Sequence, residues 1–475
     1  MNIDDTFVNL IKRSGILIPR TYENTSFYQS IKEHLTRRSQ DYTKSVLIVN
    51  EFFLESEKFM LIPRYFPIQK YIHSFSVSEK SHRGMDIKIE HNIKPRSETQ
   101  EKAINFMLRS ESGILQLPPG VGKTVISIYM IAERKKKSLI LVHRDSLADQ
   151  WRDRILSFTN LNEKDVVRLT STTFKEDLKK PIIIMTTQTF VSLLKRKRKE
   201  FLIALDSAGV GVFIADEVHT SVGAPTFSEC SIHMPCKYTY GLSATPYRWD
   251  GNGDIIEYHL GEIFEDEDSK DTMDARVTAI LLDYQIDTPR RHYYVRWGGE
   301  FQRARYLNLM KKSEPFRKTL KGLLNKLQDD RDLICMAERI KLIEEVYKET
   351  NHPSKSKFCG NAKLDALEEK VVFATPGKCR DGIDAPQKDC VITTSPISNI
   401  EQLTGRIVRP QPGKKTPIVI DMIDFGCEDI SRTFHNRLKF YDRREWPVKF
   451  LMLGSDGGVH EIVRETAIQI IKGDI

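Results

Sequence analysis

The chain has 475 residues, of which 73 are Lys or Arg and 65 are Asp or Glu, so its formal net charge at pH 7 is +8. With 40% hydrophobic and 29% charged residues, the composition excludes a disordered chain, and the length predicts about three domains. No apolar run approaches the ~18 residues of a membrane helix, and the seven cysteines form no CxxC pair, so we expect a protein of a reducing compartment, the cytoplasm, without a membrane partner.

Residues 1–92 alternate short apolar runs with Pro, Gly, Ser and Asn. They begin MNIDDTFVNL, with acids where a secretory signal carries Lys or Arg, so we expect no such signal. Apolar runs at 46–49 (VLIV) and 59–62 (FMLI) predict short strands. We therefore expect a small mixed α/β domain at 1–92.

From residue 95 the pattern changes to short apolar runs separated by helical stretches. Such runs predict buried parallel strands, and their alternation with helices predicts a doubly wound sheet. A first series lies at 113–117, 139–142, 182–185, 212–215 and 238–242, and a second at 333–336, 357–359, 371–374, 390–394 and 417–421. The predicted fold class is α/β, with one doubly wound lobe at 93–284 and another at 327–475.

The segment between the two predicted lobes, 285–326, is strongly basic. It holds 11 Lys or Arg and 3 Asp or Glu, and its apolar spacing predicts helices separated near Pro315. We interpret it as a basic helical connector. A further basic run lies at 195–199 (KRKRK). A basic surplus suits a polyanionic partner, although a charge run is also typical of a solvated helix face.

A phosphate-binding loop is predicted at 117–124 (LPPGVGKT), between the first strand and an apolar helix. The glycines let backbone N–H groups surround phosphate oxygens at a helix N-terminus. The lysine would reach the β- and γ-phosphates, and the threonine hydroxyl would ligate Mg²⁺. The first position of GxxxxGK[ST] is Leu117 here instead of Gly. The residues expected to bind the nucleotide are Pro119, Gly120, Val121, Gly122, Lys123 and Thr124.

An acidic pair follows the fourth predicted strand, at the carboxyl edge where open α/β sheets bind ligands. Asp216 would hold Mg²⁺, and Glu217 would polarise the attacking water. Together with Lys123, they predict a Mg²⁺-nucleotide site with a group that polarises the attacking water.

Three ordered motifs, 216–219 (DEVH), 241–246 (GLSATP) and 402–409 (QLTGRIVR), resemble those of the superfamily 2 helicases. The resemblance covers about residues 95–425. The continuation at 246–250 (PYRWD) is most similar to the phage UvsW-type branch-migration helicases and the XPB-related group. The resemblance implies two tandem RecA-like doubly wound parallel-sheet lobes after a small N-terminal α/β domain.

The same resemblance implies further roles at the nucleotide. Gln100 matches the glutamine that reads adenine, and Gln402 would position the γ-phosphate or the water. Arg406 and Arg409 would stabilise charge on the transferred phosphoryl group. Because these arginines lie in the second lobe and the phosphate loop in the first, hydrolysis is expected to need lobe closure.

Other residues are expected to link the nucleotide to the strand or to touch the strand itself. Gly382 and Asp384, in the motif 381–386 (DGIDAP), would lie at the ATP cleft and sense strand position. The expected coupling residues are His219, Ser243 and Thr245. The expected nucleic-acid contacts are Arg144, Thr187, Gln188, Thr189, Arg248 and Thr375. Such groups bind phosphates without reading sequence, but an ordinary turn or cap is the alternative for each threonine.

Two regions keep alternative interpretations. The connector either lines the nucleic-acid track or is an exposed linker. At 64–66 (RYF) and 70–71 (KY), basic and aromatic residues alternate. The aromatic rings either stack on nucleobases or fill a core. We expect the N-terminal domain to select branched substrates. Cys230, His233 and Cys236 are spaced like metal ligands but lack a fourth, so we expect no zinc site.

The combined interpretation is an ATP-dependent DNA helicase and translocase that remodels forks and Holliday junctions in phage recombination, replication and repair. We expect it to work as a monomer, with recombination or replication proteins as possible partners. An RNA helicase of the same superfamily is the first alternative. A nucleic-acid-binding protein that uses ATP only as a switch is the second.

Overall fold

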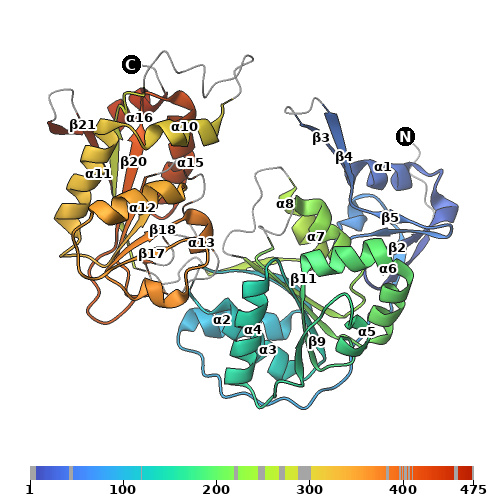
Figure 1. Ribbon diagram of the computed structural model, residues 1–475. Helices are drawn as coiled ribbons and strands as arrows, with labels where there is room; N and C mark the ends of the chain where they lie inside the picture. Colours follow the sequence, from blue (N-terminus) through green and yellow to red (C-terminus); the bar gives the residue numbers. More distant parts are fainter. Residues whose placement is uncertain are drawn as a thin grey trace. The chain divides into compact units, whose positions relative to one another are not determined.

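The computed structural model in Figure 1 describes residues 7–41, 46–118, 120–218, 223–243, 252–266, 273–286, 301–380, 385–394, 397, 400, 404, 407–408, 410–453 and 458–472. It divides into two compact units, Met1–Ser269 and Lys270–Ile475. Within the described ranges, no helix is long and apolar enough to cross a membrane.

The first unit opens with a five-stranded sheet of order β5-β6-β2-β1-β7. Tyr28 and Ile31 of α1 pack on it, and the same core includes Ile255 from α8, far along the chain. A hairpin, β3–β4, forms a separate two-stranded sheet. The bounds are β1 Val8–Lys12, β2 Ile16–Pro19, α1 Ser26–His34, β3 Thr36–Asp41, β4 Val46–Glu51, β5 Leu54–Glu55, β6 Phe59–Ile62 and β7 Phe75–Glu79.

The basic and aromatic residues at 64–66 are largely internal. Arg64 is 3% exposed and donates to the carbonyls of Met234, at 3.0 Å, and Cys236. Phe66 is buried in the N-terminal core. The core alternative therefore holds for Arg64 and Phe66, and Arg64 fastens the N-terminal sheet to the rest of the first unit.

The rest of the first unit is a seven-stranded parallel sheet of order β10-β11-β9-β12-β13-β8-β14. Alternate strand residues feed two cores: Ile182 and Ile184 face α2, α3 and α4, while Ile183 and Met185 face α5 to α8. The strands are β8 Ser112–Gln116, β9 Ser138–Val142, β10 Val166–Arg168, β11 Ile182–Thr186, β12 Val212–Asp216, β13 Tyr238–Ser243 and β14 Ile263–Glu265. The helices are α2 Glu98–Arg109, α3 Lys123–Arg134, α4 Asp145–Phe158, α5 Phe174–Asp177, α6 Thr187–Ser207, α7 Gly223–Ser231 and α8 Gly253–Leu260.

The second unit is an eight-stranded sheet of order β17-β18-β16-β19-β20-β15-β21-β22, parallel except for β21–β22. Helices α15 and α16 cover one face, and α10, α11 and α12 cover the other. The strands are β15 Arg276–Leu282, β16 Leu333–Met336, β17 Lys355–Phe358, β18 Val371–Ala374, β19 Cys390–Thr393, β20 Ile418–Asp424, β21 Val448–Leu453 and β22 Val459–Ile462. The helices are α10 Arg303–Met310, α11 Glu314–Leu327, α12 Ile340–Glu349, α13 Pro376–Arg380, α15 Glu428–Arg443 and α16 Arg464–Lys472.

The predicted fold class is confirmed, since both series of apolar runs form parallel sheets. The boundaries differ from the expected ones, however. Strand β15 lies inside the range predicted for the first lobe, yet it pairs with β20 and β21 of the second unit. An apolar run predicts a strand but does not identify the sheet that the strand joins.

The described part of the basic segment 285–326 belongs to the second unit. Tyr306 of α10 and Leu320 of α11 are buried in its core. Arg317 pairs with Glu345, at 2.8 Å, and with Glu349 of α12, so part of the positive charge is neutralised locally. Pro315 lies in the first turn of α11, where its missing N–H removes no helical hydrogen bond.

Candidate functional site

The strands of the first unit bring their carboxyl ends to one edge of the sheet. The register pairs Ser243 of β13 with Gln116 of β8, and Leu242 of β13 with Asp216 of β12. Strand β9 lies between β12 and β11. The loops that follow these strands therefore begin side by side, at the edge where open α/β sheets bind ligands.

The loop after β8 has the backbone of a phosphate cradle. Gly120 and Gly122 have φ angles of 98° and 94°, which residues with a Cβ rarely adopt. A Cβ on Gly122 would lie 2.9 Å from Nε2 of Gln100. Lys123, the first residue of α3, donates from Nζ to the carbonyl of Leu117 at 2.6 Å. Its ammonium thus lies over the loop, at the positive end of the helix dipole.

Gln100 holds this loop against α2. The side chain is 5% exposed, its Oε1 accepts the N–H of Arg96 at 2.8 Å, and its Nε2 donates to the carbonyl of Val121 at 2.6 Å. An amide has a second N–H and a second lone pair. The contacts on the protein backbone are therefore compatible with the expected contact to a base.

Asp216, at the end of β12, is 9% exposed. Its Oδ2 accepts a hydrogen bond from the indole N–H of Trp151 at 2.7 Å, and its Oδ1 accepts the N–H of Glu217 at 2.9 Å. Burial, followed by the charge of Glu217, raises the pKa of Asp216, while Trp151 and Lys123 oppose this shift. Glu217 has a φ of 50°, a costly conformation for a residue other than glycine. A bound cation would relieve the negative charge gathered here.

Ser243 connects the motif 241–246 to the phosphate loop. The residue is fully buried, and its carbonyl accepts the N–H of Leu117 at 3.1 Å. The end of β13 is thereby fastened to the start of the phosphate loop.

These residues fit a nucleotide with its magnesium ion. The glycine cradle with Lys123 suits phosphates, and the hard oxygens of Thr124 and Asp216 suit Mg²⁺. Thr124 follows Lys123 on α3 and is half-buried. Bound Mg²⁺ would neutralise phosphate charge and orient the γ-phosphate.

The expected strand contacts of the first unit differ in accessibility. Arg144, before α4, and Gln188, at the start of α6, are exposed, and Gln188 donates to the carbonyl of His143 at 3.0 Å. Thr187 is 1% exposed, with its hydroxyl bonded to the carbonyl of Val142. Thr189 hydrogen bonds with Thr186, the N-cap of α6. Thr189 therefore takes part in the cap of α6, whereas Thr187 fastens the start of α6 to the end of β9. The exposed residues here are Arg144 and Gln188.

In the second unit, Thr375 is half-buried directly after β18, and its carbonyl accepts the N–H of Cys379.

Sequence reasoning missed Arg437, a buried residue of α15. It donates to Asp421, at 2.7 Å, and to the carbonyl of Ile397, five residues before the motif 402–409. The expected residues that lie outside the described ranges are Pro119, His219, Thr245, Arg248, Gly382, Asp384, Gln402, Arg406 and Arg409.

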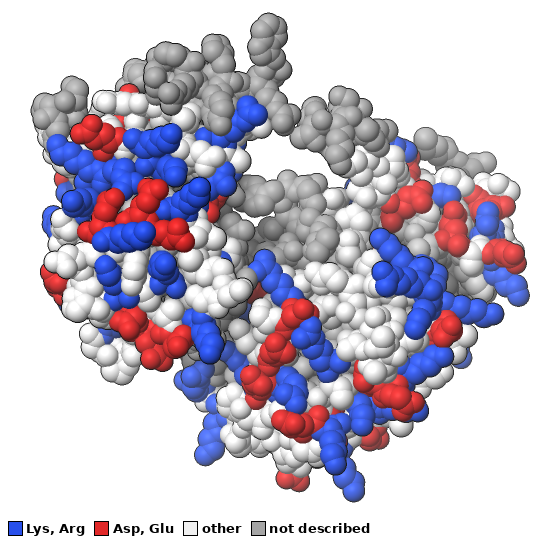
Figure 2. Space-filling view, in the orientation of Figure 1, with Lys and Arg blue, Asp and Glu red and all other residues white. Residues whose placement is uncertain are grey.

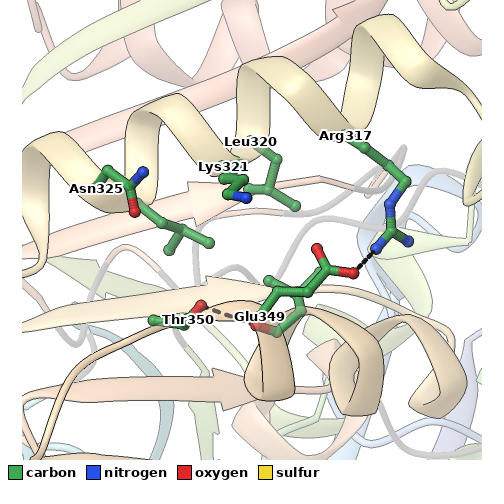
Figure 3. Close-up of a pocket in the computed structure, with 8 residues that line it drawn as sticks. Arg317, Leu320, Lys321, Asn325, Glu349 and Thr350 are labelled. Carbon is green, nitrogen blue, oxygen red and sulfur yellow. Dashed lines mark hydrogen bonds and ion pairs between the residues drawn. The ribbon is translucent and has the colours of Figure 1, made fainter.

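Sequence reasoning also missed Trp151. It lies on α4, two helical turns after Arg144. An apolar position on a helix gives no sign that its indole N–H reaches the carboxylate of Asp216 at the end of β12. Figure 3 shows a separate small pocket between α11 and α12, where Arg317 points toward Glu349. Arg317 is already paired with Glu345 and Glu349, so this pocket does not offer the phosphate-binding and magnesium-binding groups of the candidate site.

Comparisons with known proteins agree with these motifs. The family model "Type III restriction enzyme, res subunit" matches residues 92–248. A "Putative ATP-dependent RNA helicase" of Acanthamoeba polyphaga mimivirus is 23% identical over 92% of this chain and 86% of its own. The XPB helicase/translocase subunit of factor IIH from Enterocytozoon bieneusi is 32% identical over 34% of this chain and 29% of its own. The crystal structure of T4 UvsW matches 94% of this chain and 99% of its own, at 17% identity and a TM-score of 0.39. The resemblance to the superfamily 2 helicases, with viral helicases and XPB among the relatives, is therefore confirmed.

Proposed function

We propose that the chain is an ATP-dependent DNA helicase and translocase that remodels branched DNA. The observation that carries this proposal is the convergence of Lys123, Asp216 and Glu217 at one sheet edge, with Ser243 bonded to the same loop. Exposed Gln188 and Arg144 follow neighbouring strands of that edge. ATP chemistry and strand binding thus draw on adjacent loops.

Each residue has a stated task in the proposed reaction. Lys123 and the N–H groups of the loop bind the β- and γ-phosphates, and Gln100 contacts the base. Glu217 orients the attacking water, while Asp216, held by Trp151, and Thr124 bind the magnesium ion. Loss of the γ-phosphate changes the contacts of the loop, and Leu117 passes that change to Ser243.

The second unit supplies the remaining groups in this proposal. Gln402 positions the γ-phosphate, and Arg406 and Arg409 stabilise the developing charge, a role worth roughly 10³- to 10⁵-fold in rate. Gly382 and Asp384 report strand position to the nucleotide. We further propose that the enzyme works as a cytoplasmic monomer and that its N-terminal domain selects forks and junctions.

We propose DNA rather than RNA as the substrate because the names of the XPB relatives refer to DNA repair and to a DNA 3'-5' helicase. The mimivirus relative is named as an RNA helicase, which makes an RNA helicase the second candidate. A role in phage recombination, replication and repair belongs to the DNA proposal.

The test is the ATPase rate of the full chain with single-stranded DNA, duplex DNA, a four-way junction and structured RNA. We expect the junction to stimulate most and to be converted to its arms only with ATP. Lys123→Ala serves as the blank, since loss of one charged contact to the reacting phosphate typically costs about 10²- to 10³-fold in kcat. Equal stimulation by RNA would assign the second candidate, and no stimulation by any nucleic acid would contradict both.

A further inference from the structure

The basic run 195–199 on α6 is displayed to solvent in full. All six residues from 195 to 200 are exposed, and five of them are cations. Figure 2 shows a cluster of blue side chains on the first unit, where Figure 1 draws α6. The cations are Lys195, Arg196, Lys197, Arg198 and Lys199.

A straight amphipathic helix does not expose six residues in a row. α6 buries Leu193 and Leu194 before the run and Phe201 after it, and a period of 3.6 residues would bury position 197 or 198 as well. Instead, Lys197 has φ −139° and ψ 36°. The helix kinks at this residue and all five cations of the run are exposed, which the solvated face of a regular helix does not explain.

Local acids neutralise little of this charge. Arg198 lies 4.0 Å from Glu229, and Glu200 pairs with Lys175 of α5 at 2.9 Å. In the part of the chain that the structure describes, four cations of the run make no ion pair, and they are Lys195, Arg196, Lys197 and Lys199. Of these, Lys197 has its Nζ 5.6 Å from the centroid of the Phe174 ring. Closely spaced like charges repel one another, so an external polyanion would stabilise the run.

The position of the run indicates which polyanion. α6 begins at the sheet edge with exposed Gln188, and residue 195 lies about 10 Å further along its axis at 1.5 Å per residue. A nucleic-acid strand that advances about 3.4 Å per phosphate spans this distance with three phosphates. We propose that 195–199 is a second, sequence-independent binding site for the phosphate backbone, beyond the strand track. This inference rests on the proposed function.

The experiment compares two triple variants of the full chain that each lose three positive charges. Lys195→Gln/Arg196→Gln/Lys199→Gln removes the three cations of the run that have neither an ion pair nor a ring contact, and it keeps Lys197 and Arg198. Lys88→Gln/Arg109→Gln/Lys164→Gln removes exposed cations elsewhere on the same unit. Affinity for labelled duplex DNA is measured by anisotropy between 50 and 200 mM salt, and the ATPase rate is measured with saturating DNA.

We expect the first variant to bind duplex DNA with a log K against log salt slope shallower by about 2 to 3, with unchanged kcat at saturating DNA. The control should keep the wild-type slope. If the wild type lacks nucleic-acid-stimulated ATPase, the proposed function fails. If the wild type is stimulated but the first variant keeps its slope, or the control loses as much, only this inference is overturned. Unchanged DNA binding with lost binding to phosphatidylglycerol vesicles would also overturn it, in favour of a lipid surface.

Discussion

The buried contact between Trp151 and Asp216 is the feature of the site most open to test at the residue scale. Trp151 is 1% exposed, and its N–H lies 2.7 Å from Oδ2 of Asp216. A hydrogen bond to a charged group contributes about 1.5–3 kcal/mol. Because the bond also fixes the carboxylate, we expect Trp151 to act as a positioning residue for the proposed magnesium site.

Trp151→Phe keeps most of the ring volume and removes the N–H donor. We expect the Mg²⁺ concentration for half-maximal ATPase to rise roughly 10- to 100-fold, the equivalent of that hydrogen bond, while DNA affinity stays unchanged. Steady-state ATPase against Mg²⁺ measures the effect. Trp446→Phe, a buried change in the second unit, is the control, and an equal Mg²⁺ dependence in the two variants would contradict the positioning role.

At the scale of elements, α10 is held to β20 by a buried carboxylate. The hydroxyl of Tyr306 donates to Oδ2 of Asp424 at 2.7 Å, and Oδ1 accepts the N–H groups of Tyr284 and Gly426. Burial, with a smaller contribution from the charge of Asp283, raises the pKa of Asp424 to about 6 against the opposing hydrogen bonds of Tyr306, Tyr284 and Gly426. The folded state therefore binds this proton more tightly than the unfolded state does.

A raised pKa in the folded state sets the sign of the pH dependence. The contribution of Asp424 to stability is present in full below pH 4 and is lost as the pH rises through 6, by roughly 2–3 kcal/mol. Asn does not titrate, so Asp424→Asn should lack this loss of stability. The Tm of the wild type should therefore fall relative to that of the variant between pH 4.5 and 7. Thermal unfolding at the two pH values measures it, and a constant difference would exclude the shift.

The elements show which features the sequence specifies. Apolar runs such as 182–185 form strands because only a buried parallel sheet satisfies them on both faces, and the loop 117–124 was recognisable because its glycines and lysine are local. Two other features depend on partners distant in sequence: the sheet that β15 joins and the contact of Trp151 with Asp216. Local pattern carries no information on them.

At the scale of the whole molecule, each unit contains a buried arginine that ties distant segments together. Arg64 donates to carbonyls at 234–237 and connects the N-terminal sheet with the seven-stranded part of the first unit. Arg437, 1% exposed, pairs with fully buried Asp421 and holds the carbonyl of Ile397. The N-terminal domain also shares Ile255 with the lobe, so a chain that begins at residue 94 would expose apolar surface. Point substitutions are therefore the better probe of that domain.

Arg64→Met and Arg437→Met form a matched pair of buried arginine substitutions, one in each unit. Removing one partner of a buried ion pair costs about 3–5 kcal/mol, so we expect Arg437→Met to destabilise the second unit strongly. Arg64→Met leaves buried carbonyls without a hydrogen-bond donor, which costs about 1–3 kcal/mol of folding free energy each. We therefore expect it to destabilise the first unit. Hydrogen exchange of the full chain, resolved by peptide, locates each effect. Faster exchange confined to 7–266 for Arg64→Met and to 273–472 for Arg437→Met would establish two independent folding units, whereas faster exchange across both ranges in either variant would show that they unfold as one.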